Sequence, residues 1–276
     1  MSSMKPFRVI QISDTHLSRG KDWFVGNFLA VAGIVAERRP DLVINSGDIA
    51  FDGADNEDDL AFAQAHHAGL VAPVRTIPGN HDLGDSPWDD EVKQRITPLR
   101  RDRYRRYFGE DYWAADAGHW RLIGLNAQLL GSGLAAEADQ WSFLATTAAA
   151  TAERPVALFI HKPLFDARPD ETEINGRYVL PDDRRRLLDT LSGTRLKLVA
   201  SGHVHQHRRR RIDGIDHCWA PSTAFILPDS MQPRIGTKQV GYVAYAFGED
   251  DVTIDVVEAP ELTNHDLANF RGAYGH

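Results

Sequence analysis

Short motifs of aspartate, asparagine and histidine recur along this sequence, each directly after a run of apolar residues. The richest is Gly79-Asn80-His81-Asp82, which follows the apolar run from Val74 to Pro78. Glycine lets the backbone pass close to a bound group because it has no Cβ, and asparagine and histidine are neutral oxygen and nitrogen ligands. Short β-branched runs predict buried strands, so ligand-bearing loops at strand ends indicate one shared site. The other four motifs are Asp14-Thr15-His16, Gly47-Asp48, His161 and Gly202-His203-Val204-His205.

The motifs supply the number of ligands that a pair of metal ions needs. Two ions with four protein ligands each, sharing one carboxylate, require seven residues. Asp48 is the natural bridge, because a carboxylate has two oxygens and Asp48 is the only ligand in its loop. The mixture of imidazole and oxygen donors suits Mn, Fe or Zn, as two divalent or mixed-valence ions, and is too rich in nitrogen for Ca or Mg alone. The predicted ligands are Asp14, His16, Asp48, Asn80, His161, His203 and His205.

Such a centre predicts hydrolysis of phosphate esters. Only Asp14 and Asp48 are anionic, so two divalent cations leave the site positive overall. Metals about 3.5–4 Å apart can hold a bridging hydroxide that attacks phosphorus, and can clamp the attacking and leaving oxygens. Asn80 would help to stabilise the developing charge. His81 is not needed as a ligand and is the expected proton donor to the leaving alcohol, a role worth about 10²- to 10⁴-fold.

In their order and spacing these five motifs resemble those of the calcineurin-like metallophosphoesterase superfamily. The resemblance covers residues 14 to 205, and every ligand position is filled. It implies a four-layer α/β/β/α sandwich with two mixed sheets and a dinuclear site at the strand ends. It also implies that His81 donates a proton or binds phosphate. By position, one metal would take Asp14, His16, Asp48 and His205, and the other Asp48, Asn80, His161 and His203.

Within that superfamily the sequence is similar to bacterial class III cyclic-nucleotide phosphodiesterases. The Gly-His-Val-His-Gln segment that ends at Gln206 and the compact size carry this similarity. Many of those enzymes have a second histidine beside the one that matches His161, whereas Ile160 and Lys162 stand there in this chain. We therefore expect a phosphodiesterase that includes cyclic nucleotides among its candidate substrates. The alternatives are a phosphomonoesterase or nucleotidase, a hydrolase of nucleoside-diphosphate-linked substrates, and a non-catalytic scaffold.

Strand and helix patterns alternate along the first two-thirds of the sequence, and the last third holds mainly strands. This order predicts α/β layers built on more than one sheet, in a single domain over residues 1–276. Loops are expected at 79–82, 84–98 and 166–180. The expected strands are 7–13, 42–46, 74–77, 120–125, 156–160, 196–201, 208–212, 215–219, 238–247 and 252–257, and the expected helices are 22–39, 56–70, 98–108, 137–150 and 182–191.

Composition limits the partners and the compartment. The formal net charge is −8, which disfavours nucleic acid and anionic membranes as partners. Cys218 is the only cysteine, which excludes an intrachain disulfide and fits a reducing compartment. No apolar run approaches the roughly 18 residues of a membrane helix, and we expect a cytoplasmic protein. Its expected partner is a small-molecule phosphate ester, and a homo-oligomer is left open.

Several polar residues and one segment near the motifs have more than one interpretation. Asp52 is expected in a solvated loop, with support of His81 as the alternative. Asp82 is expected to stabilise its loop. Asn126 either caps a turn or touches the substrate, and the segment from Pro221 to Gly241 either shapes the pocket or packs against a second copy.

Overall fold

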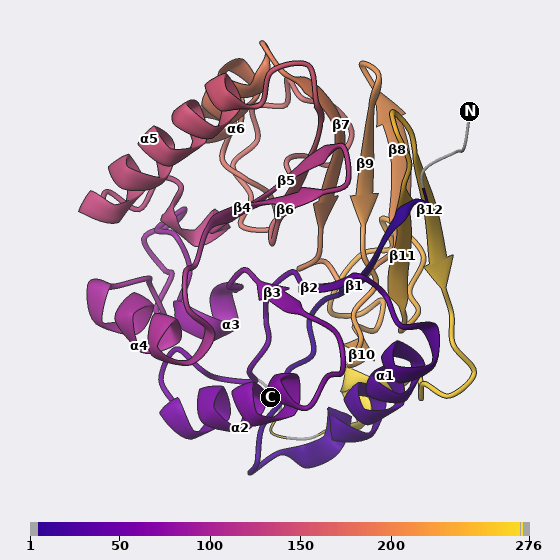
Figure 1. Ribbon diagram of the computed structural model, residues 1–276. Coiled ribbons are helices and arrows are strands. Elements are labelled where there is room, and N and C mark those ends of the chain that lie inside the picture. The colour runs from indigo at the N-terminus through magenta and orange to yellow at the C-terminus, as the bar shows by residue number, and fades with distance from the viewer. Residues whose placement is uncertain (1–4, 271, 273–276) are drawn as a thin grey trace.

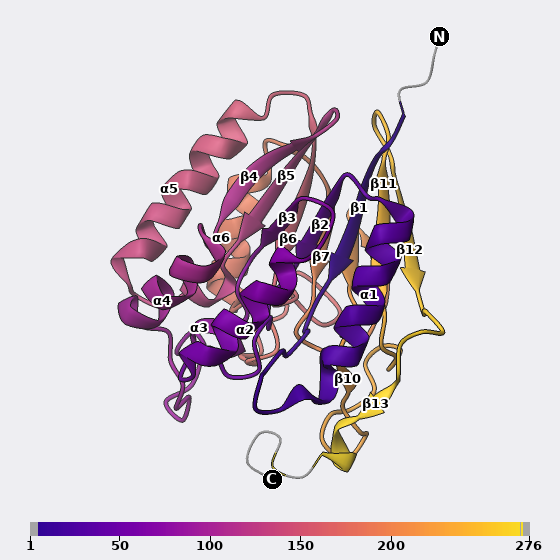
Figure 2. The same cartoon turned by 60° about the horizontal axis from the view of Figure 1, so that its bottom comes forward.

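Two mixed β-sheets stack face to face, and helices cover their outer faces (Figures 1 and 2). The structure is a computed structural model that describes residues 5–270 and 272. Figure 2 shows the layers in succession, from α5 through the two sheets to α1. This arrangement confirms the predicted α/β/β/α sandwich.

The first sheet has five strands in the order β12-β11-β1-β2-β3. Its three parallel strands are joined by helices α1 and α2, and β11 and β12 extend it antiparallel beyond β1. The elements are β1 (Phe7–Ile12), α1 (Val25–Arg38), β2 (Leu42–Asn45), α2 (Glu57–Ala68), β3 (Val74–Thr76), β11 (Tyr242–Phe247) and β12 (Val252–Val257).

The second sheet has six strands in the order β4-β5-β6-β7-β9-β8. Strands β5, β6, β7 and β9 are parallel, and antiparallel strands close both edges. Its elements are β4 (Trp113–Ala117), β5 (Trp120–Leu125), α5 (Ala135–Ala150), β6 (Pro155–Ile160), α6 (Pro181–Leu191), β7 (Arg195–Ser201), β8 (Arg208–Ile212) and β9 (Ile215–Trp219). The remaining elements are α3 (Asn80–Leu83), α4 (Pro98–Phe108), β10 (Phe225–Ile226), β13 (His265–Asp266) and 3-10 turns at Asp22–Phe24, Ala127–Leu129 and Leu267–Asn269.

Successive residues of the central strands face different apolar layers, because side chains alternate along a strand. In β6, Phe159 packs between the sheets with Tyr245, and Leu158 packs outward in the layer that contains Leu187 of α6. In β1, Val9 faces the other sheet and Ile10 faces α1 and α2. Continuously apolar strands therefore mark sheets that are buried on both faces.

The structure differs from the sequence-based expectation in three places. Residues 113–117 form β4, although no strand is predicted there; their short, mixed Trp-Ala-Ala-Asp-Ala pattern carries little strand signal. The two-residue strands β10 and β13 were also missed, because they pair segments forty residues apart. Asn80–Leu83 form a short helix rather than a loop. In the described part of the chain, no helix is long and apolar enough to cross a membrane.

A buried histidine on α2 makes the fold sensitive to acid. The His67 side chain is buried, its Nδ1 lies 2.8 Å from the Ala63 carbonyl oxygen, and its Nε2 lies 2.9 Å from the Asn45 amide nitrogen. These partners assign the ring proton to Nδ1 and make Nε2 a hydrogen-bond acceptor, so the His67 imidazole is neutral. Burial lowers the pKa of His67 from 6.5 to about 4.

We expect the free energy of unfolding to fall as the pH drops from about 6.5 to about 4. Over that range the unfolded chain binds a proton that buried His67 resists, so acid favours unfolding. The difference in pKa corresponds to about 3 kcal/mol, fully present above pH 6.5 and lost towards pH 4. Urea unfolding of metal-free protein across this range would measure it, with His67→Gln as the comparison. Equal pH dependence in both proteins would contradict the assignment.

Candidate metal centre

The seven candidate ligands follow the ends of five strands, at one rim of the stacked sheets. Strands β1, β2 and β3 are parallel in the first sheet, and β6 and β7 are parallel in the second. The carboxyl ends of parallel strands lie at the same edge of a sheet, so the segments that leave them can meet. Six ligands lie on loops: Asp14 and His16 after β1, Asp48 after β2, His161 after β6, and His203 and His205 after β7. The seventh, Asn80, is the first residue of α3, which follows β3.

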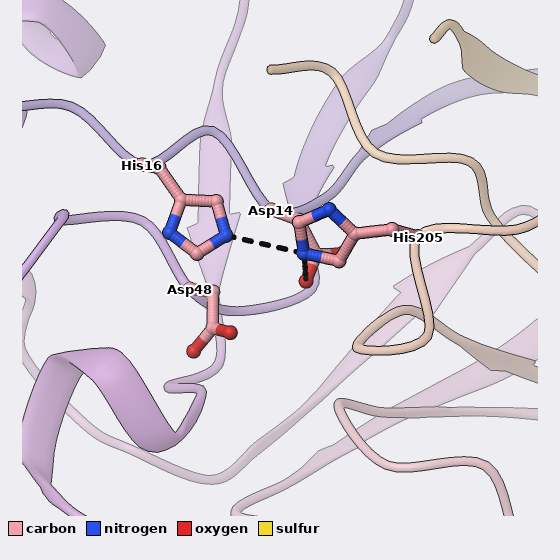
Figure 3. Close-up of side chains that lie close together, drawn as sticks. All are labelled: Asp14, His16, Asp48 and His205. Carbon is pink, nitrogen blue, oxygen red and sulfur yellow. Dashed lines mark hydrogen bonds and ion pairs between the residues drawn. The ribbon is translucent and has the colours of Figure 1, made fainter. Parts of the chain in front are cut away.

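A first cluster consists of Asp14, His16, Asp48 and His205 (Figure 3). One ligand atom from each residue lies within 4.8 Å of the others, and all four residues are buried. The Nε2 atoms of His16 and His205 are 3.2 Å apart, and His205 Nε2 lies 3.3 Å from a carboxylate oxygen of Asp14. Two carboxylates and two imidazoles that face one point form a donor set suited to a transition metal.

A second cluster shares Asp48 with the first and adds His161 and His203. His161 Nε2 lies 3.3 Å from an Asp48 carboxylate oxygen, and the two imidazole rings are 4.9 Å apart at their centroids. Asn80 lines the same pocket as Asp48 and His203. The structure therefore brings together the residues that the sequence singles out, with Asp48 common to both groups.

The unsatisfied polar atoms at this rim fit a bound cation. Among the described residues, Asn80 Oδ1, His161 Nε2 and His203 Nδ1 are buried here without a hydrogen-bond partner. Leaving buried polar atoms unpaired is costly, and all three atoms are of types that coordinate metals. The opposite ring nitrogen of His161 lies 2.8 Å from the Ser46 carbonyl oxygen. That contact places one ring proton on Nδ1 and turns Nε2 towards the site, the orientation found in metal-binding histidines.

The backbone at the ligands is left-handed rather than extended. The φ angles of Asp14, His16, Asp48, His203 and His205 are between +43° and +69°. The loop that carries Asp14 and His16 therefore does not continue the extended backbone of β1, and the side chains of both residues reach the site. Each such residue costs about 1 kcal/mol, and hydrogen bonds between the loops hold them, such as His16 N to the Asp48 carbonyl oxygen at 3.0 Å.

Two motif glycines permit this close packing. Gly47 has a φ of +106°, and a Cβ there would lie 2.8 Å from His161 Cγ. A Cβ on Gly79 would lie 2.7 Å from Asp48 Cγ. Neither position has room for a side chain, which explains the glycine in both motifs.

The charges of the site attract cations to Asp48. Burial alone would raise the pKa of Asp48, yet His161 and His81 hold it well below its usual range. Burial alone would lower the pKa of His161, yet the Asp48 carboxylate raises it to about 9. The pKa of His16 is lowered, mainly by burial and then by His81. Asp48 is thus an ionised carboxylate, shielded from water, that stabilises nearby positive charge.

His81 lies at the edge of the first cluster and lines the same pocket. Its ring centroid is 5.0 Å from that of His16, and its Nδ1 lies 3.1 Å from the Phe51 carbonyl oxygen. Its backbone N–H donates to Asp48 at 2.8 Å. His81 belongs to neither ligand cluster.

Three neighbouring polar residues have structural partners. Asp82 accepts backbone N–H groups from Ile49, Ala50 and Gly79, which stabilises the loop after β2. Asp52 accepts from Gln94 at 2.9 Å. Asn126 is buried and caps the turn at Ala127–Leu129 by accepting from the Gln128 backbone.

Lys162 occupies the position beside His161 at which the sequence departs from many cyclic-nucleotide phosphodiesterases. The side chain is buried, and its Nζ lies 2.6 Å from an Asp85 carboxylate oxygen. Burial and His161 lower the pKa of His203, and the Lys162 charge adds to this effect. The departure therefore introduces an internal ion pair and leaves both ligand clusters intact.

The candidate metal centre opens into a pocket of about 310 Å³. Part of the segment from Pro221 to Gly241 lines this pocket, as expected for a segment that shapes it. Sequence patterns did not single out these lining residues, because apolar and basic side chains in irregular loops carry no periodic signal. Besides the candidate ligands and His81, the lining residues are Arg177, Phe225, Leu227, Met231, Gln232 and Leu267.

Comparisons with known proteins agree with this geometry. The calcineurin-like phosphoesterase family model matches residues 7–207. The serine/threonine-protein phosphatase CPPED1 of Danio rerio is 27% identical over 243 residues, which cover 76% of this chain and 74% of the relative. A probable glycerophosphodiester phosphodiesterase, GpdQ, of Arcobacter nitrofigilis is 29% identical over 72% of this chain and 71% of its own. The 3′,5′-cyclic-nucleotide phosphodiesterase alr5338 of a Nostoc species is 24% identical over 82% and 81%.

Proposed function

The chain belongs to the calcineurin-like phosphoesterase family, a family of phosphate-ester hydrolases, and from that premise we propose that it hydrolyses phosphodiesters at a pair of metal ions. The observation that carries the proposal is the two ligand clusters that share Asp48, in which every residue except the half-buried His203 is buried. One ion is assigned to the first cluster, and the other to the second cluster together with Asn80. Mn, Fe and Zn are the proposed metals, because imidazole and oxygen donors suit them.

When bound, the two ions would polarise the phosphoryl oxygens and activate the attacking water. The protein's own groups have separate tasks. Asp48, which both clusters share, would hold the two ions together. The orphaned Asn80 Oδ1 would complete the second ligand set, and the Asn80 amide would help to stabilise charge on the phosphate.

His81 is the proposed proton donor. Its Nδ1 is occupied by the Phe51 carbonyl oxygen, so the proton transferred to the leaving alcohol is assigned to Nε2. General acid catalysis of this kind contributes about 10²- to 10⁴-fold.

Diesters are preferred in this proposal for two reasons. Two relatives with substantial coverage are named as phosphodiesterases, one for glycerophosphodiesters and one for cyclic nucleotides. The pocket also has apolar side chains, including Phe225 and Leu227, against which the second organic group of a diester can lie. Cyclic nucleotides remain among the proposed substrates. The single cysteine, Cys218, is buried, and a cytoplasmic location remains a proposal.

Removal and return of metal tests the proposed function. We expect the purified protein to hydrolyse bis(p-nitrophenyl) phosphate, to lose this activity after dialysis against a strong chelator, and to regain it with Mn²⁺ or Zn²⁺. Elemental analysis should find about two ions per chain in the active protein. Metal-loaded protein that is inert towards phosphodiesters and phosphomonoesters alike would overturn the proposal.

A further inference from the structure

One cationic side chain lines the pocket that the candidate ligands open into. Within the described residues, Arg177 is the single arginine or lysine in the lining, and the other members outside the ligand set are mostly apolar. It comes from the loop between β6 and α6, far in sequence from His81 and from the apolar wall formed by Phe225, Leu227, Met231 and Leu267.

The loop that carries Arg177 is anchored on both sides of the residue. Val179 N–H donates to the Pro163 carbonyl oxygen at 2.9 Å, which ties the loop to the chain just beyond the candidate ligand His161. The Arg177 N–H donates to the Asn175 side chain at 3.0 Å. The neighbouring Tyr178 packs beside Trp219, with ring centroids 6.0 Å apart. The backbone of Arg177 is therefore fixed with respect to the metal centre.

The guanidinium group of Arg177 is not committed to the fold. No side-chain hydrogen bond or ion pair joins it to another residue in residues 5–270. Other arginines of this region are paired: Arg208 bonds to Asp166 and lies over the Trp219 ring. Arg184, on α6, donates to carbonyl oxygens of the loop that precedes this helix. An arginine that presents five donors to a pocket is suited to a carboxylate or a phosphate.

The net charge of the site indicates which substrates Arg177 would favour. Two divalent ions, the two carboxylates of the ligand set and the attacking hydroxide would together leave one positive charge, which the single negative charge of a phosphodiester balances. The Lys162–Asp85 ion pair is neutral overall. Arg177 therefore adds a positive charge that a simple phosphodiester leaves unbalanced, so the pocket is more complementary to a substrate with a second negative charge.

We infer that Arg177 is a specificity-determining residue that binds a second anionic group, a phosphate or a carboxylate, on the alcohol part of the substrate. The inference rests on the proposed function and narrows its substrate class to phosphodiesters that carry such a group. The apolar wall receives the uncharged portion of the ester. The anionic group does not react, so its binding lowers KM rather than raising kcat.

Three synthetic diesters with one common leaving group test this inference. They are the p-nitrophenyl esters of carboxyethyl phosphate, propyl phosphate and phosphorylcholine, which differ in the charge of the distal group: negative, neutral and positive. We expect kcat/KM of the metal-loaded protein to decrease in that order. In Arg177→Gln, kcat/KM for the carboxyethyl ester should fall about 10- to 100-fold, as expected for loss of a charge-assisted hydrogen bond. This fall should appear in KM.

The other two substrates and two further variants make the result specific. In Arg177→Gln, kcat/KM for the propyl ester should change by less than about threefold. For the choline ester kcat/KM should rise, because the arginine charge that repels the choline cation has been removed. Arg177→Lys should keep part of the preference for the carboxyethyl ester over the propyl and choline esters. Arg185→Gln removes an exposed arginine that pairs with Asp182 on α6 and should leave all three rates unchanged. Added salt should reduce the preference for the carboxyethyl ester.

The outcomes separate the inference from the function on which it rests. Wild-type protein that hydrolyses all three esters, with an Arg177→Gln variant that affects the three alike, would overturn the inference and leave the phosphodiesterase standing. Metal-loaded wild-type protein that hydrolyses none of the three would count against both.

Discussion

Replacing Asp48 with alanine is expected to remove the two metal ions together and to lower turnover by more than about a thousandfold. Asp48 is the residue common to both clusters, so its loss takes one ligand from each ion. The metals carry several kcal/mol of transition-state stabilisation, and about 4 kcal/mol corresponds to three orders of magnitude in rate. Elemental analysis of purified Asp48→Ala and its rate with bis(p-nitrophenyl) phosphate would check both parts.

Asp52→Ala is the matched control for this variant. Asp52 lies four residues along the same loop and accepts a hydrogen bond from Gln94, outside both clusters. The Asp52→Ala variant should retain both metal ions and most of its activity. If Asp48→Ala kept two ions per chain, Asp48 would not be a bridge, and the shared-ligand arrangement would have to be abandoned.

His81→Ala is expected to lose about 10²- to 10⁴-fold in kcat while it keeps its full metal content. His81 lies beside the first cluster, at 5.0 Å from His16 between ring centroids, and belongs to neither ligand group. Its proposed task is to protonate the leaving alcohol. The loss should therefore be greatest for alkyl esters and smallest for p-nitrophenyl esters, whose leaving group needs little help.

Measuring kcat for a series of leaving groups, with metal analysis of each preparation, distinguishes the two roles of His81. A catalytic His81 gives a steeper dependence on leaving-group acidity in the variant than in the wild type. Loss of metal in His81→Ala, or an equal loss of rate for every leaving group, would instead assign the His81 side chain to the support of the metal centre, where its ring lies beside that of His16.

The alternation of strands and helices predicted α/β layers on more than one sheet, and the resemblance of the motifs to a known family implied the four-layer sandwich. The central strands could be recognised because they are buried on both faces. Runs such as Val156 to Ile160 are apolar at every position, and the segments between them carry helical periodicity. Strand β4 was missed because three of its five residues are alanine and one is charged. The pairing of β10 with β13 depends on contacts between distant segments, and a local pattern contains no record of such contacts.

The residues of the candidate site could be selected from the sequence, but their geometry could not. Residue type and motif order sufficed to choose Asp14 and His205. Both residues have a left-handed backbone. At Asp14 it is held by hydrogen bonds to other loops, such as Asp14 N to the Gly47 carbonyl oxygen at 2.9 Å, and residue type does not reveal such contacts. Arg177 was missed for a related reason: it stands in an irregular loop, and only the folded chain shows which surface that loop reaches.

The apolar wall of the pocket begins where the ligand-bearing part of the chain has already ended. The last candidate ligand is His205, whereas Phe225, Leu227, Met231 and Leu267 come from the final quarter of the sequence. Gln206 joins the two parts, because its side chain accepts from the backbones of Ile235 and Gly236. Substitutions in this late segment can therefore change the apolar wall that receives the substrate without replacing a candidate metal ligand.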